Sequence, residues 1–176
     1  MPRSPFVSFI LISYRHKNFI KDCIESILAQ TYSNMEILYL DDASGEGTYQ
    51  AAETYKAKLE AKFERVEFIE NPANQGLVKN LNKLVRMCRG KYVKFLAADD
   101  FMLPDGIEKL TGFMENHPEY DMIYSNGISG DENSHFPLKN IADYECLYQG
   151  EQISGSAVFQ SLYKGDFIYA PTVMLR

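Results

Sequence analysis

The sequence predicts an α/β protein whose mostly parallel central sheet is covered by helices on both faces. Short apolar runs of strand length alternate with segments whose apolar residues have helical spacing, and this alternation fills the first two-thirds of the 176 residues. The 45% hydrophobic and 24% charged content is typical of a folded globular chain. The length suits a single domain, so we expect residues 1–176 to form one unit.

Five strands and four helices are expected in this alternation. The strands are 7–14, 36–40, 66–69, 92–96 and 122–125, and the helices are 18–30, 48–63, 75–89 and 104–116. Thr48 is a candidate N-cap for the second helix, and Pro104 is expected to open the fourth. In helix 75–89 one apolar face is predicted, and Gly90 is expected to end the helix. That face consists of Leu77, Leu81, Leu84, Val85 and Cys88.

The pattern weakens after Ser125. Residues 126–150, with Gly127, Gly130 and Pro137, are expected to form a loop or an irregular hairpin. A short helix near 156–163 and a strand near 169–175 are expected to follow.

Net charge and hydropathy exclude several classes of protein. The 18 basic residues stand against 24 acidic ones, and a net charge of −6 makes sequence-independent nucleic-acid binding a poor fit. To bind an anionic ligand such as a nucleotide, the chain would need a local positive charge that offsets its net negative charge. A bound metal ion is the simplest source of that charge. No apolar run approaches the roughly 20 residues of a membrane span, and the apolar start lacks a signal-peptide cleavage site, so we interpret it as a buried strand.

The three cysteines are Cys23, Cys88 and Cys146. They are far apart and odd in number, which favours reduced thiols over a metal site or a disulfide framework. The histidines, His16, His117 and His135, show neither metal-ligand spacing nor a nucleophile partner, and we assign none of them a role.

Two pairs of aspartates follow predicted strands, Asp41-Asp42 after the second and Asp99-Asp100 after the fourth. Because ligands of parallel sheets bind beyond the carboxyl ends of the strands, we expect both pairs to converge on one crevice together with Ser13-Tyr14. Adjacent carboxylates repel unless a cation or hydrogen-bond donors compensate, and Mg²⁺ or Mn²⁺ binds few carboxylates and leaves positions for phosphate oxygens. Alternatively, one aspartate of Asp99-Asp100 caps the next helix and the other is solvated.

The remaining candidates have equally plain alternatives. Asp41-Asp42 begins a segment of Ala, Ser and Gly that any strand-to-helix turn uses, although an aspartate here could accept hydrogen bonds from a base or a ribose. Tyr14 could stack on a nucleobase or simply pack. Lys79 could meet a diphosphate or be a solvated surface lysine.

Taken together, six segments in order resemble the family 2 glycosyltransferases, nucleotide-sugar enzymes of the GT-A fold. They cover roughly residues 5–126 and are most specific as a set. They are Val-Ser-Phe-Ile-Leu-Ile-Ser-Tyr at 7–14, Cys-Ile-Glu-Ser-Ile-Leu-Ala-Gln-Thr-Tyr at 23–32, Leu-Asp-Asp-Ala-Ser at 40–44, Asn-Gln-Gly-Leu-Val-Lys-Asn at 74–80, Gly-Lys-Tyr-Val at 90–93 and Leu-Ala-Ala-Asp-Asp-Phe-Met-Leu-Pro at 96–104.

This resemblance implies a base pocket at one side of the crevice. Ser13 and Tyr14 would line it, with Tyr14 against a uracil-type ring. Asp42 would hydrogen-bond the base, and Asp41 would shape that turn. The family commonly has Pro, Thr and Asn around this tyrosine, where this chain has Ile12, Ser13 and Arg15, so the identity of the base stays open.

On the diphosphate side the resemblance implies that Asp99 holds a divalent metal, Mn²⁺ or Mg²⁺, as the last acid of the family's Asp-x-Asp motif. Asp100 would be a secondary ligand or an acceptor-side group, and Lys79 stands where the family often has a basic residue near the donor. Many members carry an acid two residues before Asp99, where this chain has Ala97. A contact made there must be absent or supplied elsewhere.

The expected activity is transfer of a sugar, with inversion, from a nucleotide-diphosphate donor, UDP favoured, to a hydroxyl of a saccharide or lipid-linked acceptor. The family's general base follows a segment like 170–176, so we expect it downstream of Arg176 and expect this chain to be the donor-binding part of a longer protein. Asp131 or Glu132 could serve as the general base instead, but only their negative charge supports that role. By analogy with the family, we expect a cytoplasmic enzyme of polysaccharide synthesis with peripheral contact to the inner membrane face.

Two alternatives come from other classes of protein. A non-catalytic or regulatory nucleotide-sugar-binding module is favoured by Ala97 and by the missing base. A phospho-acceptor signalling domain also carries acids at strand ends, but it needs paired acids after the first strand. This chain has Tyr14-Arg15-His16 at that point.

Overall fold

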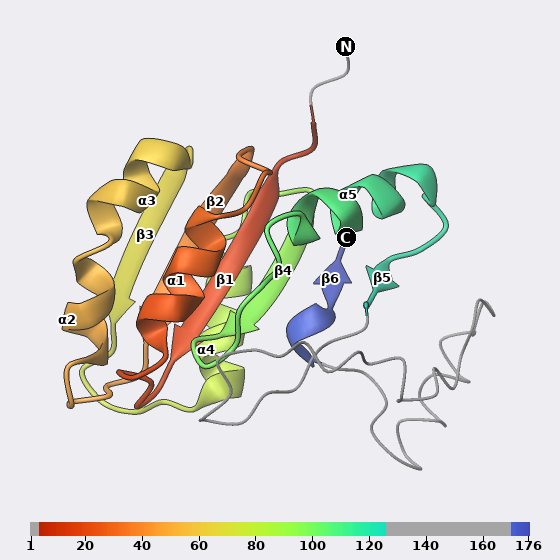
Figure 1. Ribbon diagram of the computed structural model, residues 1–176. Helices are drawn as coiled ribbons and strands as arrows, with labels where there is room; N and C mark the ends of the chain where they lie inside the picture. Colours follow the sequence, from red (N-terminus) through yellow and green to blue (C-terminus); the bar gives the residue numbers. More distant parts are fainter. Residues whose placement is uncertain (1–3, 126–169) are drawn as a thin grey trace, which may run out of the picture.

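The apolar runs build a six-stranded sheet with the strand order β3-β2-β1-β4-β6-β5 (Figure 1). The computed structural model describes residues 4–125 and 170–176. The strands β1 (Val7–Ser13), β2 (Met35–Asp41), β3 (Arg65–Glu70) and β4 (Tyr92–Ala97) are mutually parallel. The short strands β5 (Met122–Ile123) and β6 (Met174–Leu175) pair with each other, and β6 pairs with β4, both antiparallel. The predicted, mostly parallel sheet is therefore confirmed.

Helices cover both faces of this sheet, as predicted. The helices α1 (Ile20–Leu28), α2 (Thr48–Glu53), α3 (Lys56–Lys62) and α5 (Gly106–Asn116) lie on one face, and α4 (Leu77–Val85) lies on the other (Figure 1). All residues of β1 and β2 are buried, because both faces of these central strands are covered. This explains their nearly continuous apolar sequences.

The predicted helix 48–63 is wrong as a single helix, since the structure divides it into α2 and α3. The hydroxyl of Thr54 donates to the carbonyl of Ala51 at 2.7 Å, and such a bond competes with the helical ladder. Thr48 is not the N-cap either. Gly47 occupies that position with φ at 100°, and Thr48 donates both its N–H and its hydroxyl to the carboxylate of Glu46.

The predicted apolar face of α4 is also partly wrong. Leu84 is fully buried, but Leu77 is 60% exposed and Val85 is 43% exposed. The core-facing position belongs instead to Asn80, whose side-chain oxygen accepts a hydrogen bond from Asn71. The helix ends at Val85, before Gly90. Gly90 has a different role, because a Cβ there would lie 2.4 Å from the backbone nitrogen of Ser8.

The other boundaries shift by a few residues. The helix expected at Pro104 begins at Gly106, because Pro104 lies in the preceding turn and its carbonyl accepts the N–H of Thr31. The strand expected at 169–175 is a 3₁₀ turn, Ala170–Thr172, followed by β6, since Pro171 has no N–H to give to a ladder. The loop expected at 126–150 and the helix expected at 156–163 lie outside the described residues.

Two further expectations concern thiols and membranes. Cys23 and Cys88 are free thiols within the described residues, and burial raises the pKa of both. Cys146 lies outside the described residues, so the reduced state of the three cysteines stays a prediction. Within residues 4–125 and 170–176, no helix is long and apolar enough to cross a membrane.

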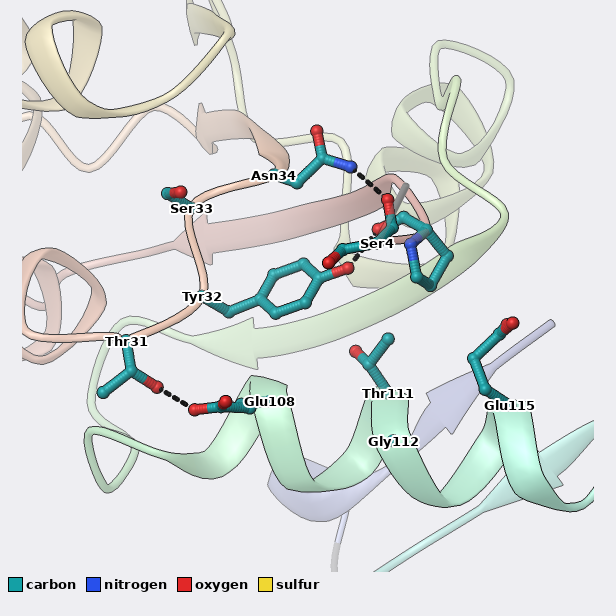
Figure 2. A pocket seen from close by; sticks show the side chains of 10 residues that line it. Ser4, Thr31, Tyr32, Ser33, Asn34, Glu108, Thr111, Gly112 and Glu115 are labelled. Atoms are coloured by element: carbon teal, nitrogen blue, oxygen red, sulfur yellow. Dashed lines mark hydrogen bonds between the residues drawn. The ribbon is translucent and has the colours of Figure 1, made fainter. Parts of the chain in front are cut away.

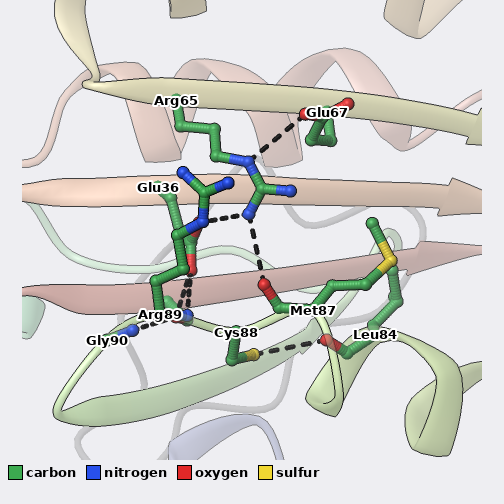
Figure 3. Close-up of polar contacts among 9 residues, drawn as sticks. Glu36, Arg65, Glu67, Leu84, Met87, Cys88, Arg89 and Gly90 are labelled. Carbon is green, nitrogen blue, oxygen red and sulfur yellow. Dashed lines mark hydrogen bonds and ion pairs between the residues drawn. The ribbon is translucent and has the colours of Figure 1, made fainter.

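A buried carboxylate joins three strands and the loop before β4 (Figure 3). Glu36 of β2 is fully buried, and its Oε1 accepts hydrogen bonds from Ser8 of β1 at 2.5 Å and from the N–H of Arg89 at 2.7 Å. Its Oε2 accepts from the guanidinium of Arg65 of β3 at 2.6 Å. This network fixes the amino ends of the strands, opposite to the edge where ligands of such sheets bind.

A buried lysine attaches the last described segment to the sheet. Lys94 of β4 is fully buried, and its Nζ donates to the carbonyl oxygens of Phe95 at 2.8 Å and of Pro171. Burial lowers the pKa of Lys94 to about 7, and the negative charge of Asp100 only partly opposes this.

Substituting Glu36 with Gln should destabilise the protein by about 3 kcal/mol, because Arg65 loses its buried ionic partner. Glu67 also contacts Arg65 but its side chain is 46% exposed, so Glu67→Gln should cost less than about 1 kcal/mol. Urea unfolding with an unchanged m-value measures both. Equal effects of the two substitutions would contradict the importance given to Glu36.

Lys94 should make stability depend on pH. Its folded-state pKa is lower than its unfolded value, so between about pH 7 and pH 10 the unfolded chain binds more protons and stability rises with pH. Below about pH 7 the lysine is charged in both states and its contribution is constant. The stability of the wild type relative to Lys94→Met should therefore rise across this window. Lys58→Met, at an exposed position, is the control and should show no such trend.

Candidate functional site

The carboxyl ends of β1, β2 and β4 form one continuous edge, which we call the carboxyl edge. Hydrogen bonding continues one residue past the strands: Asp42 N–H donates to Ser13 O at 2.9 Å, and Ala98 N–H donates to Ile12 O at 3.0 Å. Asp42 and Asp99 therefore lie on opposite sides of the end of β1, with strands spaced about 4.8 Å apart. The convergence of the two aspartate pairs, predicted from the strand order, has its basis in this register.

Asp41 is the buried support of this edge. Its Oδ2 accepts the hydroxyls of Ser13 at 2.6 Å and Ser44 at 2.5 Å, and its Oδ1 accepts the N–H of Ser44 at 2.9 Å. Tyr39 lies 2.8 Å from the Ser13 oxygen, and burial raises the pKa of Tyr39, so it remains a donor there. Ser13 and Asp41 are fully buried and contact each other, beneath the surface that a ligand would meet.

Asp42 is held by the start of α4. Its Oδ1 accepts from the Asn71 side chain and from Gln75 N–H, both at 2.8 Å, and its Oδ2 accepts from Gly76 N–H at 2.9 Å. Burial raises the pKa of Asp42, but the hydrogen bonds from Gln75, Asn71 and Gly76 outweigh it and hold the pKa below its usual range. Because a carboxylate has about four acceptor positions, roughly one remains for a ligand.

The backbone of this edge is unusually constrained. Among the described residues, the non-glycine residues with positive φ are Arg15 and Ala43, each with φ at 61°. Both flank the ends of β1 and β2, and the N–H of Arg15 donates to the Ser44 hydroxyl at 2.9 Å. Such strain persists only where surrounding contacts impose it, and it gathers at ligand sites.

Tyr14 lies at the carboxyl edge itself, whereas Lys79 lies on α4. Tyr14 is 39% exposed at the end of β1, and the guanidinium of Arg15 lies 5.2 Å from the centre of its ring. Lys79 is exposed in the first turns of α4 and lines an open depression of about 840 Å³ with the nearby Gln75, Lys83 and Arg86. Tyr14 thus presents an aromatic face at the edge, and Lys79 lies beyond the Asp42 contacts.

Asp99 and Asp100 follow β4 in a turn closed by the Asp100 N–H on Ala97 O at 3.0 Å. The side chain of Asp99 is 49% exposed, and Asp100 is half-buried. Burial, followed by repulsion from Asp99, raises the pKa of Asp100. Neither aspartate caps the following helix, because the N-cap of α5 is Asp105, so that alternative is wrong.

The sequence missed His16, which lies beside Asp99 with Nδ1 and Oδ1 3.8 Å apart. This Nδ1 is buried and has no hydrogen-bond partner. Motif spacing gave no signal for this pair, because β1 and β4 bring together residues that are far apart in the sequence.

The carboxyl edge fits a divalent cation only as a shared site. Within the part of the chain that the structure describes, no three His, Cys, Asp or Glu side chains gather to hold a metal ion by themselves. Mg²⁺-type sites that serve phosphates use one or two protein ligands and complete their shell with phosphate oxygens and water. Asp99, next to an orphaned ring nitrogen, meets that requirement.

A second cavity lies at the opposite edge of the sheet and contains none of the predicted residues. It measures about 380 Å³ and lies between α5 and the segment before β2. Figure 2 shows Glu108 and Thr111 projecting from α5 toward this segment, where Thr31 donates to Glu108 at 2.6 Å. Burial, together with Glu115, raises the pKa of Tyr32 in its wall to about 12, so this phenol stays neutral.

Solved structures share this architecture. A crystal structure of TarS residues 1–349 from S. aureus gives a TM-score of 0.69 at 20% identity, over 97% of this chain and 46% of that one. The structure of TarS in complex with UDP-GlcNAc gives a TM-score of 0.63 at 22% identity, over 74% of this chain and 36% of that one. The mannosyltransferase PcManGT from Pyrobaculum calidifontis, in complex with GDP-Man and Mn²⁺, gives 0.65 at 20% identity, over 71% and 36%. The expected GT-A fold is confirmed.

Curated sequences are more similar. EpsE of Bacillus subtilis is 33% identical over 75% of this chain and 46% of its own length. An uncharacterized glycosyltransferase of Methanocaldococcus jannaschii is 34% identical over 98% of this chain and 56% of its own length. The chain thus spans about half the length of these relatives. The family description "Glycosyl transferase family 2" matches residues 8–175, and the chain belongs to this family.

Proposed function

We propose that this chain is the donor-binding part of a longer glycosyltransferase that moves a sugar from a nucleotide-diphosphate donor, UDP favoured, to an acceptor hydroxyl with inversion. The observation that carries the proposal is the carboxyl edge, where the anchored carboxylate of Asp42 and the exposed carboxylate of Asp99 flank the end of β1. TarS was solved with UDP-GlcNAc, and PcManGT with GDP-Man and Mn²⁺, which supports a nucleotide-sugar donor.

The base end of the donor is proposed to lie at Asp42. Its carboxylate is ionised and fixed by backbone N–H groups, so it offers a rigid acceptor to a ring N–H of the base. The exposed ring of Tyr14 offers a stacking surface. Ser13 and Asp41 would support this pocket from below through their mutual hydrogen bond.

The diphosphate end is proposed to lie at Asp99, which would hold Mn²⁺ or Mg²⁺. A bound cation supplies charge stabilisation for the departing diphosphate. Asp99 is suited to this because it is ordered by the turn after β4 yet half exposed. Asp100 would be a secondary ligand or face the acceptor, and Lys79 would add a positive charge from α4.

The acceptor side is proposed to be a saccharide or lipid-linked hydroxyl, with the general base downstream of Arg176. Lys94 contributes to this side by holding Pro171, and with it the last described segment, against β4. A cytoplasmic location at the inner membrane face, in polysaccharide synthesis, stays a proposal from family analogy.

A non-catalytic nucleotide-sugar-binding module is the second candidate, favoured by Ala97 where many relatives carry an acid. Extending the gene product to the length of the relatives and assaying hydrolysis and transfer of UDP-sugars separates the two. Turnover that disappears in Asp99→Asn excludes the binding module.

Removing the Asp99 carboxylate should abolish metal-dependent nucleotide binding. Calorimetric titration of UDP should give binding to the wild type that Mn²⁺ strengthens by tenfold or more, as expected for about 1.4 kcal/mol of metal-mediated contact. Asp99→Ala should lose this strengthening and keep the weak metal-free binding. Glu115→Ala at the opposite edge is the matched control. If UDP, GDP and dTDP all fail to bind the wild type, the donor-site proposal is wrong.

Substituting Asp42 with Asn should weaken the binding of UDP but not the binding of pyrophosphate together with the metal ion. The amide presents donors to backbone N–H groups and removes a charged acceptor, which costs roughly tenfold or more in UDP affinity. Pyrophosphate with Mn²⁺ has no base, so its affinity should stay within about twofold by the same reasoning. Glu70→Gln, at the exposed end of β3, is the control. Equal losses for both ligands would show that Asp42 acts only through the fold.

A further inference from the structure

His16 occupies a fixed position at the carboxyl edge. Its backbone carbonyl accepts the N–H groups of Phe19 and Ile20, which ties the residue to the start of α1. Its side chain is 24% exposed, against 49% for the neighbouring Asp99. The backbone at His16 is therefore fixed, and the Nδ1 of its ring faces Asp99, which follows β4.

The contact between His16 and Asp99 is incomplete. Nδ1 and Oδ1 are 3.8 Å apart, which is too long for a direct hydrogen bond. Nδ1 is nevertheless shielded from solvent and has no hydrogen-bond partner in the described part of the chain. A buried polar atom without a partner is costly, and an atom that bridges Nδ1 and the Asp99 carboxylate would satisfy it.

A divalent cation fits this gap. Two ligand atoms that each lie about 2.1 Å from one ion are between about 3 Å and 4.2 Å apart, depending on the angle at the metal. In a near-octahedral shell these two limits are the separations of cis and trans ligands, so the observed 3.8 Å requires the two side chains to shift by about half an ångström when the ion binds. A carboxylate and a neutral imidazole nitrogen are both metal ligands, and they leave the other positions to phosphate oxygens and water.

The chemistry of the nitrogen also discriminates between cations. Mg²⁺ prefers oxygen ligands, whereas Mn²⁺, although it also binds oxygen ligands and has the lowest affinity in the Irving–Williams order, is a transition-metal ion and accepts an imidazole nitrogen more readily than Mg²⁺ does. We propose that His16 is a second protein ligand of the divalent cation beside Asp99, and that it makes the site prefer Mn²⁺ to Mg²⁺. This inference rests on the proposed function, because the nucleotide diphosphate completes the metal shell.

Electron paramagnetic resonance tests this ligand directly. The ¹⁵N-labelled chain is loaded with Mn²⁺ and unlabelled UDP, and pulsed measurements record nitrogen coupling to the metal. The wild type and His117→Ala should show ¹⁵N coupling, and His16→Gln should lose it. His117 is the matched control because it is exposed and pairs with Glu119. Bound Mn²⁺ without ¹⁵N coupling in the wild type overturns the proposal.

Affinity measurements separate ligation from a purely structural effect. With UDP present, His16→Gln should lower the affinity of the protein for Mn²⁺ by about tenfold or more. The same substitution should lower its affinity for Mg²⁺ by less than about threefold. Equal losses for both cations, or no loss for Mn²⁺, would overturn the proposal. Circular dichroism checks that the variant is folded.

The two proposals fail in different ways. If the wild type binds UDP with Mn²⁺, and Asp99→Ala abolishes this while His16→Gln does not alter it, only the role of His16 is wrong. If the wild type binds no nucleotide with either cation, the proposed function fails and the role of His16 fails with it.

Discussion

The anchoring of Asp42 by the start of α4 is the interaction on which the carboxyl edge depends. This carboxylate ends β2 and receives N–H groups from Gln75 and Gly76, so it joins the central strand to the helix on the other face of the sheet. Asn71, just after β3, donates to the same group and passes a second hydrogen bond to Asn80 inside α4. One ionised side chain thus satisfies the backbone at a helix start and fixes where the neighbouring loops begin.

The two ends of the sheet use buried charge differently. At the amino end, Glu36 has its partners supplied by Ser8, Arg65 and the Arg89 backbone, so its charge is balanced within the protein. At the carboxyl edge, Asp99 and Asp100 repel each other and burial raises the pKa of Asp100. A carboxylate whose charge is neutralised by protein groups stabilises the fold. Two neighbouring carboxylates without such partners instead favour the binding of a cation.

The sequence predicted the parts of the fold that depend on local pattern. β1 and β2 could be located because strands buried on both faces appear as continuous apolar runs, and the shared edge for Asp42 and Asp99 follows from parallel order alone. Errors arose where a single side-chain hydrogen bond decided the outcome. Helix α4 is rotated because Asn80 faces the core to meet Asn71, so Leu77 is exposed despite its apolar spacing. The break between α2 and α3 coincides with the hydrogen bond from the Thr54 hydroxyl to the Ala51 carbonyl.

His16 shows most clearly why the candidate site could be predicted only in part. A histidine one residue beyond the Ser13-Tyr14-Arg15 segment carries no motif, and its significance comes from the pairing of β1 with β4, which places Asp99 beside it. Its unpartnered nitrogen is visible only once burial and hydrogen bonds are known. The sequence indicated that a contact was missing at Ala97, but a linear pattern cannot show which side chain from another strand faces the same space. The base end and the diphosphate end therefore differ in kind: Asp42 is fixed by hydrogen bonds within the protein, whereas Asp99 and His16 approach each other without a direct hydrogen bond.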